Sequence, residues 1–386
     1  TVRIANNVRW IETLNFYYIP SFSEFIVDKG NYYISSIDGV LFDITGTTLL
    51  AFPRCKSGSY KIPDGVTKIK ESAFRNCNGL TSLEIPSSVT SIGEWAFKDC
   101  STLKDLIISD SNTALTGEDS NFNESSLETI YLGRDINISF SGQSNLEELT
   151  IGSKVTAINE SAFAGCTGLT SLIIPDNVTS INSKAFIGCT KISNITLGKG
   201  LKQIGYSAFS TCTAVTTIDI PDSVSILGDY AFAFCNGLHT ITLGCGLKEI
   251  GRSAFENCTD LKTILCRATT PPTCKALCFN NVDKAQCYLL IPFGAGNAYK
   301  TANEWKDFFL ISGIKENVLD NKDKIVMYKL NGKIRIDNVA PETPIAIFSS
   351  DGKLVYNGKT CLLSTSDADD EDARVDLGGG RRRQPK

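Results

Sequence analysis

The sequence predicts a solenoid, mostly β, in which 23-residue coils carry a parallel β-sheet on one face and a short helical turn. A small antiparallel β-domain is expected to follow it. Two observations predict the solenoid. An Ala-Phe pair recurs with steps of 23 residues, and a cysteine follows each of these phenylalanines by three positions. A unit of this size cannot bury its apolar side alone, so neighbouring coils must stack.

The repeat places two large columns of identical residues inside the predicted solenoid. Half of the 14 cysteines belong to it, so we interpret both columns as architecture and not as catalytic groups. The phenylalanines are Phe74, Phe97, Phe163, Phe186, Phe209, Phe232 and Phe255. The cysteines are Cys77, Cys100, Cys166, Cys189, Cys212, Cys235 and Cys258, and we expect them to be free buried thiols.

One coil can be followed from residue 80 to residue 100. Leu83 and Ile85 alternate with polar residues, which predicts a strand, and Pro86 ends it. Val89 and Ile92 begin a second extended side. The residue before the Ala-Phe pair suits the N-cap of the short helical turn where it is serine, at Ser72, Ser161, Ser207 and Ser253.

The repeat is irregular between Phe97 and Phe163. Rungs that begin at Leu103, Leu127 and Leu146 fill this gap, and residues 112–126 lack the Ala-Phe-Cys element. We expect an exposed bulge or a distorted coil there, either functional or a tolerated insertion. The carboxylates of this segment match no calcium-binding loop, so a solvated loop is the expectation for Glu118, Asp119 and Glu124.

Composition and motifs indicate that the chain is not an enzyme. The net charge is −4, which argues against nucleic-acid binding, and no apolar run is long enough for a membrane span. His239, the only histidine, lies at a solvent-facing position of the repeat. No catalytic residue, cofactor or metal site is predicted. For Cys266, Cys274, Cys278 and Cys287, plain thiols, disulfides and zinc ligation all stay open.

The outward side of the first strand is the candidate ligand face, because solenoid proteins commonly bind through such a surface. One outward column is Ser82, Asp105, Thr129, Glu148, Ser171, Asn194, Thr217, Thr240 and Thr263. The other is Glu84, Ile107, Tyr131, Thr150, Ile173, Thr196, Asp219, Thr242 and Leu265. The candidate binding residues are Glu84, Asp105, Tyr131, Glu148, Asn194, Thr196, Asp219 and Thr242.

The coil pattern resembles the BspA-like leucine-rich repeats of bacterial surface proteins over about residues 30–315. Pro271-Pro272, Ile291-Pro292, Tyr299 and Trp305 resemble the closing segment of that family. The resemblance implies a non-enzymatic, secreted or cell-surface adhesin, for example from Bacteroidetes, that binds host matrix or plasma proteins or other microbes. A surface glycan-binding module and a structural spacer are the alternatives, and some parasitic protists also carry the repeat.

The expected domain boundaries lie where the 23-residue period begins and ends. We expect a worn N-terminal coil or cap at 1–29, the solenoid at 30–265 and its cap at 266–315. Residues 316–360 alternate like a small β-domain and are similar to C-terminal sorting domains of Bacteroidetes, incompletely. Residues 361–386, with Cys361, change composition abruptly and are expected to be a disordered or non-native tail. The first residues contain no starting Met, so the chain is expected to be a fragment or a mature form.

Overall fold

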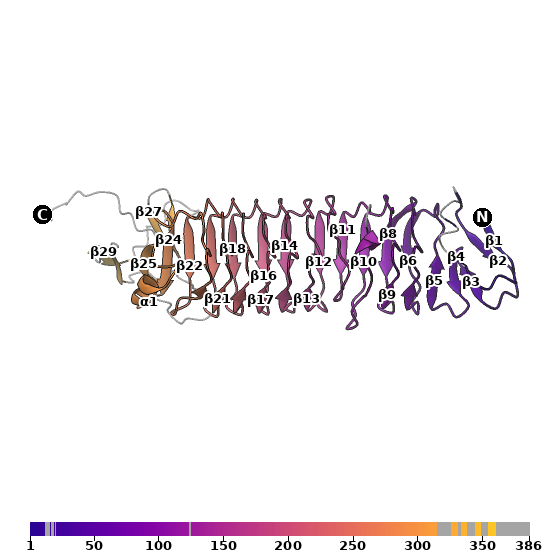
Figure 1. Ribbon diagram of the computed structural model, residues 1–386, viewed down its shortest axis with the longest axis horizontal. Coiled ribbons are helices and arrows are strands. Elements are labelled where there is room, and N and C mark those ends of the chain that lie inside the picture. The colour runs from indigo at the N-terminus through magenta and orange to yellow at the C-terminus, as the bar shows by residue number, and fades with distance from the viewer. Residues whose placement is uncertain are drawn as a thin grey trace, which may run out of the picture. The chain divides into compact units, whose positions relative to one another are not determined.

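The computed structural model describes residues 1–11, 16, 19, 21–122, 125–292 and 294–314, and four later strands between residues 326 and 359. The chain divides into two compact units. The first contains Thr1–Leu261 and Pro272–Val282, and the second contains Lys262–Pro271 and Asp283–Lys386. The first unit is the solenoid, whose coils follow one another in Figure 1. The predicted tail, with Cys361, lies outside the described residues.

The longer strands of the first unit form its main parallel sheet surface. Their alternating apolar side chains point inward, and each pairs with the strand one coil away in the register that the repeat predicts. They are β6 (Gly58–Lys61), β8 (Leu80–Ile85), β10 (Asp105–Ile108), β11 (Thr129–Leu132), β12 (Glu148–Ile151), β14 (Ser171–Ile174), β16 (Asn194–Leu197), β18 (Thr217–Ile220) and β20 (Thr240–Leu243). We call their outward side the long-strand face.

A second side of each regular coil carries a two-residue strand, as the Val-x-x-Ile pattern predicts, and isolated bridges at Thr116 and Ile136 take this place in the irregular segment. These strands also pair in parallel from coil to coil. They are β7 (Lys68–Ile69), β9 (Ser91–Ile92), β13 (Ala157–Ile158), β15 (Ser180–Ile181), β17 (Gln203–Ile204), β19 (Ile226–Leu227), β21 (Glu249–Ile250) and β23 (Thr273–Cys274).

The N-terminal part departs from this pattern. Strands β1 (Val2–Ile4) and β2 (Phe25–Val27) pair in parallel, whereas β3 (Ile34–Ile37), β4 (Val40–Asp43) and β5 (Thr48–Ala51) pair antiparallel in that order. The parallel sheet begins where β5 pairs with β7. Residues 34–51 therefore fold as an antiparallel meander before the regular repeat.

The second unit begins with β22 (Thr263–Cys266), followed by β24 (Tyr288–Pro292), helix α1 (Gly296–Thr301) and β25 (Phe309–Ile314). Tyr299 and Trp305 are buried, and the Tyr299 hydroxyl donates to the Ala268 carbonyl at 2.7 Å. Two antiparallel pairs follow. They are β26 (Val326–Leu330) with β27 (Lys333–Asp337), and β28 (Pro344–Phe348) with β29 (Leu354–Lys359). A separate sorting-type domain at 316–360 stays a prediction.

The phenylalanines form a continuous stack through the first unit. Ring centroids of neighbouring coils lie 5.5 Å apart for Phe186 and Phe209, and 5.3 Å apart for Phe209 and Phe232. The stack also contains four rings outside the predicted column, at Phe52, Phe122, Phe140 and Phe279. Residues 51–55, Ala-Phe-Pro-Arg-Cys, are in fact an earlier copy of the repeat motif.

The expected helical turn and its serine N-caps were wrong. The segment around each Ala-Phe pair is a run of turns, and Ser72, Ser161, Ser207 and Ser253 have φ between 50° and 56°. An N-cap residue is extended and its side chain accepts a backbone N–H, but the Ser72 and Ser253 hydroxyls are buried without a hydrogen-bond partner. Lys184 and Tyr230 share this left-handed conformation, because the coil must reverse there whatever the residue.

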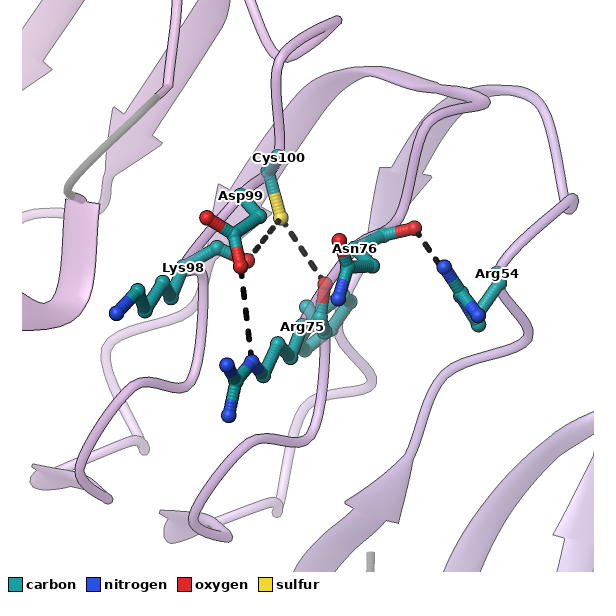
Figure 2. A network of polar contacts seen from close by, with 7 residues as sticks. Arg54, Arg75, Asn76, Lys98, Asp99 and Cys100 are labelled. Carbon is teal, nitrogen blue, oxygen red and sulfur yellow. Dashed lines mark hydrogen bonds and ion pairs between the residues drawn. The ribbon is translucent and has the colours of Figure 1, made fainter. Parts of the chain in front are cut away.

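The column cysteines are thiols that donate across coils. Cys100, drawn in Figure 2 beside the ion pair of Arg75 with Asp99 (Nε to Oδ2, 3.6 Å), donates from Sγ to the Phe74 carbonyl at 3.0 Å. The other column thiols donate in the same way to the phenylalanine of the preceding coil. No disulfide bond joins the 13 cysteines in the described part of the chain.

Polar side chains replace the cysteine column in the irregular segment. Phe122 ends a short 3-10 helix, Asp119–Phe122, and the Gln143 amide donates from Nε2 to the Phe122 carbonyl at 2.9 Å. Gln143 follows Phe140 by three residues, so it occupies the cysteine position and makes the same cross-coil bond. Asn121 is also buried, and its Oδ1 accepts the Ala96 N–H at 2.9 Å. The segment is thus a distorted coil that continues the core.

Arg134 is a buried residue in the core of the same irregular region. Its side chain is fully buried, and its guanidinium donates to the carbonyls of Pro86, Ser87 and Val89 at 2.7–3.1 Å. Burial lowers the pKa of Arg134 from its ordinary value, but a guanidinium stays charged in proteins. The side chain supplies hydrogen bonds to carbonyls that lie more than 40 residues earlier in the sequence.

Candidate ligand face

The strand register brings the two predicted outward columns together on the long-strand face. Asp105 pairs with Ser82 and with Thr129, and Thr129 pairs with Glu148. In the second column, Ile107 pairs with Glu84 and with Tyr131. The outward side chains therefore lie about 4.8 Å apart from strand to strand, as in any sheet.

The candidate residues fall into two groups along this face. Glu84, Asp105, Tyr131 and Glu148 lie on β8, β10, β11 and β12, which hydrogen-bond to one another as one sheet with β6. Asn194 and Thr196 lie on β16, Asp219 on β18 and Thr242 on β20. Asn194, Thr196 and Asp219 are exposed, and Thr242 is half-buried.

Tyr131 is held in place by a hydrogen bond at the end of its strand. Its hydroxyl donates to Asp110 Oδ1 at 2.9 Å, and this bond raises the pKa of Tyr131 above its ordinary value. The Asp110 backbone and carboxylate lie against Gly133. A Cβ at Gly133 would come within 2.7 Å of Asp110 Oδ1 and within 2.6 Å of the Asp110 backbone nitrogen. Glycine is required because the two coils approach so closely.

Other carboxylates of the face accept hydroxyl groups of neighbouring residues. Thr129 Oγ1 donates to Asp105 Oδ1 at 2.8 Å, and Thr150 Oγ1 donates to Glu148 Oε1 at 3.3 Å. Glu84 instead pairs with Lys61 on β6, Nζ to Oε1 2.9 Å. These bonds orient the carboxylates and leave the negative charges of Asp105 and Glu148 without an ion-pair partner among the described residues.

Exposed apolar side chains complete the second column. Ile107 is 41% exposed and lies beside Tyr131 in register, and Ile173 on β14 is 65% exposed. Isolated exposed isoleucines are common on protein surfaces. Ile107, however, adjoins a fixed aromatic ring, and aromatic side chains are enriched at binding hot spots.

Two members of this site were missed from the sequence. Asp110 follows β10 in the irregular segment, and its contact with Tyr131 depends on how that segment folds back. Lys61 lies on β6 before the regular repeat, and only its register with Glu84 places it on the face. For Lys61 the sequence did contain a signal. The residue stands two positions after Ser59 in a strand-like segment, so both side chains point to the same side of the strand.

Within the described residues, no group of three or more histidine, cysteine or carboxylate side chains is arranged to hold a metal ion. His239 is exposed, and its Nδ1 lies 2.6 Å from the Gly237 carbonyl. Across the same residues, no helix has the length and apolar character that crossing a membrane requires.

Three solved bacterial structures are similar to this chain. A leucine-rich repeat protein from Bacteroides ovatus is 21% identical, with 82% of this chain and 81% of that chain covered and a TM-score of 0.48. For a leucine-rich repeat protein from Eubacterium ventriosum the identity is 24%, the coverage 60% and 57%, and the TM-score 0.44. A leucine rich cell surface protein from Faecalibacterium prausnitzii is 21% identical, with coverage of 69% and 88% and a TM-score of 0.33. No curated protein gives a significant match.

The family comparison covers most of the solenoid. A family described as BspA type leucine rich repeat region matches residues 49–170 and 156–284, with six copies of its repeat, which together make up more than half of the chain. These residues contain the phenylalanine stack, the cysteine column and the long-strand face. The chain belongs to the BspA-type leucine-rich-repeat family.

Proposed function

We propose that this protein is a non-enzymatic cell-surface protein that binds other proteins through the long-strand face. The partners are host matrix or plasma proteins or the surface proteins of other microbes. The observation that carries the proposal is the register of the outward columns, which points their side chains outward from three successive parallel sheets, β8 to β12, β14 with β16, and β18 with β20. Extended surfaces of this kind are the usual binding sites of solenoid proteins.

Family membership and one similar structure support the surface location. The protein from Faecalibacterium prausnitzii is described as a leucine rich cell surface protein. The polar and threonine-rich outward columns suit a binding surface that stays in water until a partner covers it.

Binding of the full chain to immobilised fibronectin, fibrinogen and a glycan panel at physiological salt tests the proposal. We expect saturable binding to at least one protein, weakened by the Glu148→Lys, Asp219→Lys double variant. The matched control is Glu160→Lys with Asp260→Lys, which makes the same charge change at exposed residues outside the outward columns. Binding to glycans alone would replace the proposal by a carbohydrate-binding function. Absence of all binding would leave a spacer role.

A further inference from the structure

We infer that the part of the long-strand face on β10–β12 binds a basic, extended segment of a partner protein. We call this part, formed by Asp105, Ile107, Asp110, Tyr131 and Glu148, the acidic patch. The inference rests on the proposed function and adds the chemistry of the partner. Charge complementarity decides which occupant fits this part of the face.

The charge on the outward columns has one sign. The strands β8, β10, β11, β12, β14, β16, β18 and β20 contain no lysine or arginine, whereas Glu84, Asp105, Glu148 and Asp219 are all carboxylates. Lys61 neutralises Glu84 by an ion pair at 2.9 Å. Asp105, Asp110 and Glu148 each accept a hydroxyl group, which orients the carboxylate without neutralising its charge. The nearby Lys104 attracts Asp105 but forms its ion pair with Glu128.

The patch also has an apolar centre between these carboxylates. Tyr131 lies between Ile107 and Thr150 in the second column, and its hydroxyl is already bound to Asp110. A ring that is held in the free protein loses little conformational freedom on binding, which favours affinity. Tyr131 can also receive a guanidinium or the aliphatic stem of a lysine against its ring.

The spacing of the carboxylates suits an extended polypeptide. Asp105 and Glu148 lie on strands separated by β11, which places their backbones roughly 9.6 Å apart. Alternate residues of an extended chain lie about 6.7 Å apart on one side, and the long side chains of arginine or lysine span the difference. A segment with basic residues at alternate positions therefore pairs with both carboxylates. The part of that segment between the two basic groups then lies over the ring of Tyr131.

The test uses two synthetic twenty-residue probes, one alternating arginine with threonine and one alternating glutamate with threonine. Surface plasmon resonance with the full chain should show binding to the arginine probe at about 50 mM salt and at least tenfold weaker binding to the glutamate probe. Raising the salt to about 1 M should remove most of the binding, because the screening length then falls to about 3 Å.

Matched variants localise the effect. Asp105→Asn with Glu148→Gln should weaken binding of the arginine probe roughly three- to tenfold, the size expected for two exposed ion pairs. Glu160→Gln with Asp260→Asn makes the same charge change elsewhere and should leave binding within about twofold. Tyr131→Ala should weaken binding about tenfold, whereas Tyr206→Ala, at an exposed tyrosine outside the acidic patch, should not.

Equal binding of the two probes would overturn the inference, because binding would then not depend on the charge of the partner. An equal loss of binding in the Glu160, Asp260 control variant would also overturn it, because the net charge of the molecule and not the acidic patch would then attract the probe. Failure of the arginine probe to bind at 50 mM salt would also overturn it. The double variant Asp105→Asn, Glu148→Gln is then compared with the native chain on immobilised fibronectin and fibrinogen. If both bind equally well, the acidic patch is contradicted and the proposed function stands. Binding of the arginine probe alone, with silence on the protein panel, would support the patch and reject the proposed partners.

Discussion

At the residue scale, each ring of the phenylalanine stack contributes a large buried apolar surface to its coil. Phe209 is fully buried and lies between the rings of Phe186 and Phe232. Burial of a phenylalanine side chain contributes roughly 1.5–3 kcal/mol, and its removal also leaves a cavity that the neighbouring coils fill only in part.

Replacement of Phe209 by alanine should therefore lower the free energy of unfolding by about 3–5 kcal/mol. Phe234 is a matched control, since it lies in the next coil but is 44% exposed, and its replacement by alanine should cost less than about 1 kcal/mol. Urea denaturation followed by circular dichroism measures both. Equal midpoints for the two variants would contradict the stacking account.

Arg134 should be the most costly arginine to replace. Arg134→Met keeps the aliphatic volume but leaves the carbonyls of Pro86, Ser87 and Val89 without their donors, at a cost of at least about 2 kcal/mol. Arg252→Met, at an exposed position, should change stability by less than about 0.5 kcal/mol. A difference in thermal midpoint below the error of the measurement would show that the buried guanidinium is dispensable.

At the element scale, the thiol column makes the stability of the stacked turns depend on pH. Burial raises the pKa of Cys100, Cys189 and Cys235 from an ordinary value of 9.0 to about 12. The folded state thus keeps these protons at a pH where the unfolded chain has lost them. The contribution of these thiols to the free energy of unfolding is complete below pH 9 and is lost as the pH rises toward 12.

The urea midpoint should accordingly fall as the pH is raised from 8 to 10.5, more steeply than in a Cys100→Ala, Cys189→Ala, Cys235→Ala variant. The triple variant serves as the control because lysines and tyrosines titrate in both proteins. The native protein should also react with a thiol reagent at exposed Cys55 and Cys245 long before the column reacts. Parallel pH profiles for the two proteins would refute the role of the column.

The turn element also shows where reasoning from sequence fails. Serine before a buried pair is typical of a helix N-cap, but the same position holds Lys184 and Tyr230 in other coils, and all of these residues have positive φ. The chain reversal imposed by stacking decides the backbone there, and local propensity does not. The strands were predicted correctly because their alternation reports burial on the sheet directly.

At the scale of the whole solenoid unit, each coil contacts its neighbours in an equivalent way, so coils should be exchangeable. Deletion of residues 187–209 removes one full period and joins Phe186 to Ser210, which restores the Phe-x-x-Cys spacing to Cys212. We expect a folded protein with the β-sheet circular dichroism signal and cooperative unfolding. Deletion of residues 187–197 removes about half a period and should abolish cooperative unfolding. Similar behaviour of the two deletions would contradict the equivalence of the coils.

The sequence by itself determined the coil length, the strand register, the buried columns and the outward columns, because a 23-residue period repeats one pattern of burial in every coil. Only the tertiary structure decided what happens where the period breaks. Gln143 takes the place of a cysteine, Arg134 reaches carbonyls two coils back, and Asp110 orients Tyr131. Each of these contacts joins residues whose spacing no repeat fixes, so their positions depend on the path of the chain through space and not on a local pattern.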